Sequence, residues 1–142
     1  MSETHIIVGA GQAGGWAAMG MRQAGFAGRI LLIGDESWRP YERPPLSKAM
    51  LTAEPRPEPQ YFHSQAKYQE QGIELLLGVH IIELDPIEKH VRLADGRALS
   101  YDRLLLTTGG RARPLDVPGG THALTLRTLE DAHAIRARLE RA

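Results

Sequence analysis

The chain opens with a short apolar run, a glycine-rich turn and a segment of helical character. Residues 5–9 are apolar, rich in β-branched side chains and bounded by glycine, which predicts a buried parallel strand. Small and apolar residues then recur at helical spacing over 15–24, and a second apolar run covers 29–34 and closes on Asp35. The pattern predicts a strand–helix–strand unit with a parallel sheet.

The middle of the chain changes character. Six prolines between positions 38 and 59 predict a shaped surface loop in which no long regular element persists, with one short helix over 47–52. A longer helix is predicted over 61–72, where a glycine ends it, followed by a strand over 73–77.

The next segments are shorter and alternate between polar and apolar residues. They predict an antiparallel meander of three strands, at 79–84, 90–94 and 97–101. Asp95 and Gly96 are the preferred residues of a two-residue hairpin turn. The apolar run over 103–108 predicts one more buried parallel strand, so the fold class is α/β.

The C-terminal segment predicts a helix with a defined start. Thr128 is an N-cap residue, and Asp131 at the third helical position completes a capping-box pattern. The charged residues that follow, among them Arg136 and Arg138, predict a solvated helix whose charges complement the helix dipole. Trp16 and Trp38 are interpreted as core residues.

Composition narrows the function classes. The 142 residues suit one domain, and 17 basic against 17 acidic residues give a net charge of zero, so nucleic acid and membrane surfaces are not expected partners. No stretch has the length of a membrane span or the pattern of a signal peptide, which predicts a cytoplasmic protein. The absence of cysteine excludes thiol redox chemistry, and the scattered histidines predict no metal site. Redox chemistry here needs a bound cofactor.

Gly9, Gly11 and Gly14 form a G-x-G-x-x-G pattern between the first strand and the first helix. In this context Gly9 permits the tight turn, Gly11 lets a pyrophosphate approach the backbone, and Gly14 lets helix and strand pack closely. The alternative is a small-residue turn in an unrelated fold. Because strand, helix and acidic residue are all in place, we favour a dinucleotide site.

Asp35 lies about 20 residues beyond the glycine pattern, at the end of the second strand. A carboxylate there accepts hydrogen bonds from ribose hydroxyls and repels a 2′-phosphate. Asp35 could instead cap the following turn, and Glu36 is a competitor for the ribose role. We favour Asp35 because it directly follows the strand. These motifs indicate a dinucleotide without deciding between FAD and NAD.

Three segments decide that question by resemblance: residues 39–48 (RPYERPPLSK), 105–115 (LLTTGGRARPL) and 126–128 (LRT). Together they resemble the FAD-dependent ferredoxin–NAD(+) reductases of bacterial ring-hydroxylating dioxygenase and cytochrome P450 systems, nearest to the phenylpropionate dioxygenase type. That family is related to putidaredoxin reductase and apoptosis-inducing factor. The resemblance implies a Rossmann-like three-layer FAD/NAD(P)-binding fold with an antiparallel meander.

The resemblance also implies which residues bind FAD. The amides of the glycine turn would hold the pyrophosphate, Asp35 the adenosine ribose, and the backbone of Ile81 the adenine. Arg43 and Lys48 would line the flavin side. The full implied set is Gly9, Gly11, Gln12, Ala13, Gly14, Asp35, Arg43, Lys48, Ile81, Thr108, Gly109, Arg113 and Arg127. Guanidinium groups suit phosphate oxygens, and an ammonium near the flavin favours its reduced, anionic ring. Taken alone, each arginine is better interpreted as a solvated surface residue, and Lys48 as a charge in the first turn of a surface helix, so the assignment depends on the whole run of residues.

The implied activity is electron transfer from NADH through FAD to a ferredoxin, with no catalytic acid or base expected in this chain. Disulfide reductases of this fold carry a cysteine pair that the chain lacks. Two alternatives remain: a non-catalytic module that binds FAD or another adenine dinucleotide, and an NAD-dependent dehydrogenase, which we rank low because no proton-transfer residues stand out.

The resemblance further implies an incomplete FAD domain. Residues 1–142 are expected to be its first half, without the NAD-binding and C-terminal interface domains, so full turnover by this chain alone is not expected. An unpaired strand edge would favour self-association. The chain also departs from the family at Thr107, where alanine is usual, which adds a hydroxyl that needs a partner.

Overall fold

The computed structural model describes residues 2–141, which form two compact units. The sheet unit comprises the residues up to Tyr41 together with Tyr61–Gly109. The helical unit comprises Glu42–Gln60 together with the residues from Gly110 onward.

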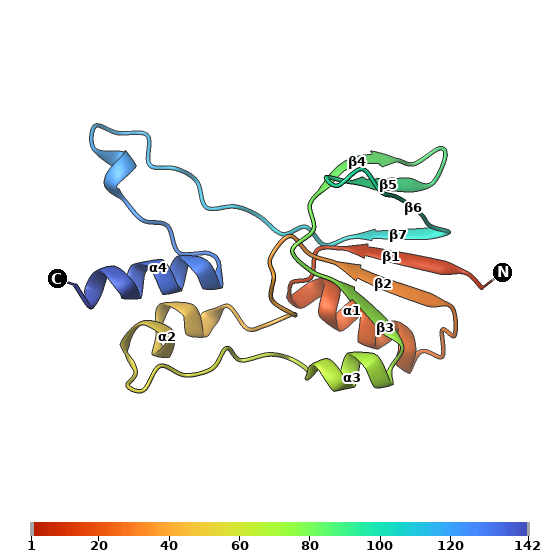
Figure 1. The fold of residues 1–142 in the computed structure, drawn as a ribbon, viewed down its shortest axis with the longest axis horizontal. Helices are drawn as coiled ribbons and strands as arrows, with labels where there is room; N and C mark the ends of the chain where they lie inside the picture. The colour runs from red at the N-terminus through yellow and green to blue at the C-terminus, as the bar shows by residue number, and fades with distance from the viewer. Residues whose placement is uncertain (1, 142) are drawn as a thin grey trace. The chain divides into compact units, whose positions relative to one another are not determined.

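A parallel sheet is the centre of the sheet unit (Figure 1). Its strands are β1 (Thr4–Val8), β2 (Arg29–Ile33), β3 (Ile73–Leu76) and β7 (Arg103–Leu106), in the order β3-β2-β1-β7. Ile7, Ile30 and Leu32 are fully buried. The inner strands are continuous apolar runs because both faces of the sheet are covered.

Two helices cover one face of the sheet: α1 (Gln12–Gln23) and α3 (Gln65–Glu70) (Figure 1). Ala18 and Met19 of α1 and Tyr68 of α3 are buried against the strands. Trp16 points away from this core and is 52% exposed, so its interpretation as a core residue is wrong. The helix faces the sheet with its small residues, which leaves the large indole outside.

The prediction of a helix over 61–72 was too long. The side chain of Ser64 accepts a hydrogen bond from the Lys67 N–H at 3.1 Å, and this cap begins α3. Tyr61 instead forms a β-bridge with Tyr41, and the Phe62 N–H donates to the Pro40 carbonyl. Pairing between distant segments therefore replaces the first turn of the predicted helix.

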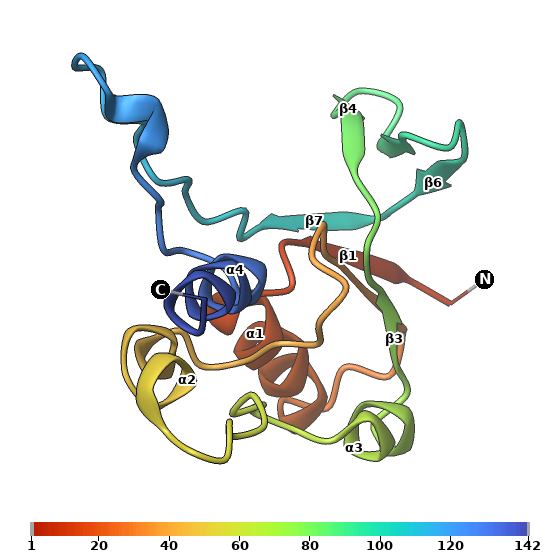
Figure 2. The same cartoon turned by 60° about the vertical axis from the view of Figure 1, so that its left-hand side comes forward.

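The antiparallel meander packs on the opposite face of the sheet, as Figure 2 shows. It consists of β4 (Ile81–Asp85), β5 (His90–Leu93) and β6 (Ala98–Ser100). Val91, Leu93 and Tyr101 share a core with Ile6 and Leu31 of the parallel sheet. Helices, parallel sheet and meander make up the three layers expected from the sequence.

The hairpin turn between β5 and β6 differs in detail from the prediction. The Leu93 carbonyl accepts from the Gly96 N–H at 2.9 Å, while the Leu93 N–H donates to the Arg97 carbonyl at 2.8 Å. Gly96 has a φ of 90°. The loop therefore spans residues 94–96, a three-residue hairpin loop with glycine at the left-handed position, rather than two residues.

The helical unit contains two 3-10 turns and two helices: η1 (Pro44–Ser47), α2 (Ala49–Thr52), η2 (Gly120–His122) and α4 (Leu129–Leu139). α2 and α4 lie side by side (Figures 1 and 2). Met50 of α2 and Leu129 of α4 are buried. The predicted capping box at Thr128 and Asp131 is present.

Arg136 contradicts the prediction of a fully solvated last helix. The residue is only 4% exposed. The guanidinium donates to the carbonyl of Ala53 at 2.8 Å and to Glu140 Oε1 at 2.8 Å, and it pairs with Glu54. The carbonyls that follow α2 need donors, and Arg136 supplies them from α4. No helix in the described part of the chain is long and apolar enough to cross a membrane.

Candidate functional site

The candidate site lies at the carboxyl edge of the parallel sheet. Val8 is in register with Ile33 on one side and with Leu106 on the other. The segments that follow β1, β2 and β7 therefore leave the sheet at the same edge. At this edge the strands end and loops begin, and ligands of open α/β sheets usually bind there.

Gly9 and Gly14 are required by the packing of this turn. Gly9 has a φ of 112°, and a Cβ there would overlap the carbonyl of Thr107. A Cβ on buried Gly14 would overlap the carbonyl of Gly9 and lie 2.8 Å from the Thr107 hydroxyl oxygen. The tight turn and the close helix–strand packing predicted for these two glycines are confirmed.

Gly11 differs from its neighbours, because nothing in the protein lies within 4 Å of the position of its Cβ. It is the N-cap residue of α1, where no side chain caps the helix and the first turn has no acidic residue. The first N–H groups of a helix have no acceptor within it, and the helix dipole makes this end positive. Gln12 and Ala13 are exposed here, so the helix start presents donors to an anion.

The structure distinguishes the two acidic residues that follow β2. Glu36 Oε2 accepts a hydrogen bond from the Tyr41 hydroxyl at 2.5 Å, and its carbonyl accepts from the Gly78 N–H at 3.0 Å. Asp35 is exposed. The preceding Gly34 lies so near the glycine turn that its Cβ would be 2.6 Å from Ala10 Cβ. Asp35 is thus the carboxylate presented at the edge, adjacent to the turn.

The remaining predicted residues of the sheet unit are close in sequence to this edge. Thr108 and Gly109 directly follow β7 and are exposed, and Gly109 has a φ of 67°. Ile81 begins β4, just after Val79, whose N–H donates to the Gly34 carbonyl at 3.0 Å. The contact at Val79 brings the start of the meander to the edge that carries Asp35.

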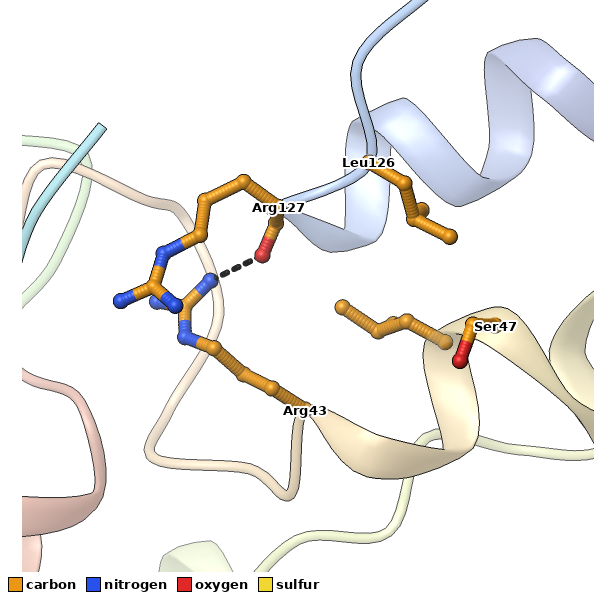
Figure 3. A pocket seen from close by; sticks show the side chains of 5 residues that line it. Arg43, Ser47, Leu126 and Arg127 are labelled. Carbon is orange, nitrogen blue, oxygen red and sulfur yellow. Dashed lines mark hydrogen bonds between the residues drawn. The ribbon is translucent and has the colours of Figure 1, made fainter. Parts of the chain in front are cut away.

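The helical unit brings two of the predicted arginines together. Arg43 Nη1 donates to the Arg127 carbonyl at 2.5 Å, and Arg127 Nε donates to the Gly110 carbonyl at 3.2 Å. Figure 3 shows both side chains at a pocket of about 110 Å³ that is also lined by Leu46, Ser47 and Leu126. Lys48 and Arg113 are exposed and are not among the described residues that line it.

Asp131 fixes the backbone beside this pocket. Its Oδ2 accepts from the N–H groups of Arg127 and Thr128, both at 2.8 Å. Partial burial opposes the charge of Asp131, but these N–H donors and the Arg43 guanidinium outweigh burial and lower the pKa of the carboxyl. The cap therefore holds Arg127 at the start of α4 with an ionised carboxylate.

From the sequence alone, Thr107 was expected only to carry a hydroxyl that needs a hydrogen-bond partner. The structure supplies it, since Thr107 Oγ1 lies 2.8 Å from the Gly9 carbonyl oxygen and 3.1 Å from that of Val8. The sign of this contact in the sequence was a polar residue at the end of an apolar strand. Tyr41, whose hydroxyl donates to Glu36, had no comparable sign in the sequence. No cluster of potential metal ligands occurs among the residues that the structure describes.

Comparisons of the chain with known proteins agree on one family. The profile of the pyridine nucleotide-disulphide oxidoreductase family matches residues 3–142. Putidaredoxin reductase CamA of Pseudomonas putida is 45% identical over 97% of the chain and 34% of its own length. The 3-phenylpropionate/cinnamic acid dioxygenase ferredoxin–NAD(+) reductase component of Photorhabdus laumondii is 47% identical over 95% of the chain and 34% of its own length.

A solved structure agrees in fold. The ferredoxin reductase for the CYP199A2 system from Rhodopseudomonas palustris superposes with a TM-score of 0.90 at 41% identity, covering 98% of the chain and 35% of that protein. The chain thus spans about a third of the length of these relatives.

Proposed function

The chain belongs to the pyridine nucleotide-disulphide oxidoreductase family, and from this we propose that it is the FAD-binding portion of a ferredoxin reductase. The proposed protein passes electrons from NADH through FAD to a ferredoxin that serves an aromatic-ring dioxygenase. The observation that carries the proposal is the uncapped start of α1 beside the open space at Gly11, with Asp35 exposed at the same sheet edge. The proposed electron transfer to a ferredoxin is taken from the names of the similar reductases.

In this proposal the sheet unit binds the adenosine diphosphate part of FAD. The backbone of Gly9, Gly11, Gln12, Ala13 and Gly14 receives the pyrophosphate, since N–H donors and the positive helix end face an anion there. Asp35 accepts from the ribose hydroxyls. Ile81 contacts the adenine through its backbone. These assignments fit a dinucleotide because the position of a Gly11 Cβ is free of protein atoms.

From the resemblance, Arg43 and Lys48 line the flavin side, and Thr108, Gly109, Arg113 and Arg127 complete the pocket. Bound FAD would supply the capacity to accept a hydride from NADH and to deliver single electrons. The residues of this chain hold and orient it, and Lys48 tunes its potential by charge. No residue here is proposed to transfer a proton.

The proposal includes a place for the chain in a larger protein. Residues 1–142 are the first half of an FAD domain, and NADH and ferredoxin bind to parts beyond this stretch. A cytoplasmic location, self-association of this stretch, and the absence of nucleic-acid or membrane partners belong to the same proposal. The chain covers about a third of the relatives' length, which supports the assignment of residues 1–142 to part of a larger protein.

A spectrum tests cofactor binding. The purified chain is mixed with FAD and desalted, its visible absorbance is recorded, and the released compound is identified by mass spectrometry. We expect retained flavin, released as FAD. A folded chain that retains none, under conditions where it is intact by circular dichroism, would contradict the assigned pocket.

Replacing Lys48 by alanine tests the assigned flavin contact. Loss of the ammonium removes a charge that favours the reduced, anionic ring, so the reduction potential of bound FAD should become more negative. Lys67→Ala, a change to a partly exposed cation on α3, serves as the control. Spectroelectrochemical titration of both variants gives the potentials. An unchanged potential in Lys48→Ala would favour a non-catalytic binding module.

A further inference from the structure

Thr107 lies outside the glycine turn and contacts it through its side chain and its backbone. Its hydroxyl oxygen lies 2.8 Å from the Gly9 carbonyl and 3.1 Å from the Val8 carbonyl. A threonine hydroxyl has one proton to donate, and the shorter contact is the one to Gly9. The hydroxyl therefore links the end of β7 to the first residue of the glycine pattern.

The backbone of Thr107 reinforces this link. Its N–H donates to the Val8 carbonyl at 2.7 Å, and its own carbonyl fills the space where a Gly9 side chain would begin. Its hydroxyl oxygen would lie 2.8 Å from a Cβ on Gly14. Thr107 thus contacts both the first and the last glycine of the turn, and both contacts depend on those residues being glycine.

The turn needs such a constraint. Gly9 has a φ of 112°, and glycine adopts this and many other conformations with little difference in energy. A flexible turn would bind a ligand only in the fraction of molecules that have the correct conformation, and the measured affinity falls by that fraction. A hydrogen bond that fixes the Gly9 carbonyl raises that fraction.

We propose that Thr107 is a positioning residue that holds the Gly9–Gly14 turn in its pyrophosphate-binding conformation before the dinucleotide arrives. It acts through the Gly9 carbonyl and not by contact with the ligand. The inference rests on the proposed function, because it assumes that the turn binds the pyrophosphate of FAD.

Two substitutions separate the hydroxyl from the shape of the side chain. Thr107→Val keeps the branched shape and removes the hydrogen bond, whereas Thr107→Ser keeps the hydroxyl and removes a methyl group. FAD affinity, measured by flavin fluorescence, should fall about five-fold in Thr107→Val, the worth of one ordinary hydrogen bond, and stay within about two-fold in Thr107→Ser. Thr125→Val, a change at an exposed threonine of the helical unit, should leave affinity unchanged.

Hydrogen exchange of the ligand-free protein gives a second readout that needs no FAD. In Thr107→Val the hydrogen-bonded amides of Gly9, Gly15 and Thr107 should exchange faster, while the amides of β2 and β3 keep their protection, and Thr107→Ser should restore the slow exchange. If Thr107→Val does not fold, Thr107→Ala takes its place in the comparison with Thr107→Ser.

The outcomes distinguish the two proposals. If the unmodified chain binds FAD and Thr107→Val binds it equally well, the positioning role is overturned and the proposed function stands. If Thr107→Val and Thr107→Ser lose affinity to the same extent, any change at this position weakens binding and the effect is not specific to the hydroxyl, which also overturns the positioning role. If the unmodified chain binds no FAD, the proposed function fails, and the positioning role fails with it.

Discussion

At the scale of single residues, the glycines of the turn serve different purposes. Gly9 and Gly14 are glycine because the protein's own backbone occupies the space of a side chain. Gly11 has no such neighbour. The first two are therefore explained by folding, whereas the third has no such explanation and is the position at which we propose that the ligand approaches.

This difference predicts opposite effects of substitution. Gly14→Ala forces a Cβ against the Gly9 carbonyl and should destabilise the protein by about 1–3 kcal/mol. Gly11→Ser should fold with unchanged or slightly higher stability, since serine is a good N-cap residue. Its hydroxyl would accept from the N–H groups that we propose bind the pyrophosphate, so FAD affinity should fall about ten-fold or more.

Urea denaturation and an FAD titration of both variants check this prediction. An unaltered FAD affinity in Gly11→Ser with normal stability would show that the open space at this position is not the pyrophosphate site, and a loss of its stability would contradict the expected N-cap.

At the scale of elements, the start of α4 depends on a charged cap. The pKa of Asp131 is lowered in the folded protein, chiefly because N–H donors outweigh the burial of the group. The unfolded chain consequently binds a proton at Asp131 more readily. The stability that this carboxylate contributes is present above about pH 4, the ordinary range for aspartate, and is lost as the pH falls through the lower folded value.

Asp131→Asn tests the charge of the cap. At pH 7 it should cost about 0.5 kcal/mol, a small value because the group is only partly buried and solvent screens it. The difference in unfolding free energy between the two proteins should shrink as the pH falls below about 4 and through the lower folded pKa, because Asp131 then loses its charge in the folded state as well. Urea denaturation at several values between about pH 3 and about pH 7 measures this difference. A difference that persists at low pH would assign the effect to shape and not to charge.

The other end of the contact between α2 and α4 depends on Arg136. Replacing it by methionine keeps much of the apolar stem but leaves the Ala53 carbonyl without this donor. A buried polar group left unpaired costs about 1–3 kcal/mol. Arg138→Met, at an exposed position of the same helix, should stay within about 0.5 kcal/mol. Equal losses in urea denaturation would contradict a special role for the buried guanidinium.

Prediction succeeded for the elements whose signal is local. β1 and β2 are buried on both sides, so their apolar runs are unbroken, and the capping box of α4 lies within four residues of sequence. The start of α3 was misplaced because the pairing of Tyr61 with Tyr41 involves a segment distant in sequence. The burial of Arg136 was missed for the same reason, since its partners precede it by many residues.

At the scale of the whole molecule, the parallel sheet ends at β7 on one side. Among the described residues, this strand pairs only with β1. Its last residue, Leu106, is 58% exposed. An apolar strand edge with unpaired backbone groups is a template for pairing with another chain.

Self-association through β7 is therefore expected of this stretch. Sedimentation velocity should show a species larger than the monomer as concentration rises, and Leu106→Lys should reduce it, since a charge on an edge strand opposes pairing. Leu115→Lys, at an exposed leucine of the helical unit, is the control. A monomer at every concentration, or an equal effect of both substitutions, would contradict association through this edge.

The sequence by itself determined the α/β class, the order of most elements, the glycine turn and the family, because these depend on periodicity and on short motifs. Tertiary structure decided which acidic residue after β2 stays exposed, which arginine of α4 is buried, and that the Thr107 hydroxyl meets the Gly9 carbonyl. Each of these depends on atoms far apart in sequence. Their positions follow from how the elements pack, and a local pattern carries no information about that packing.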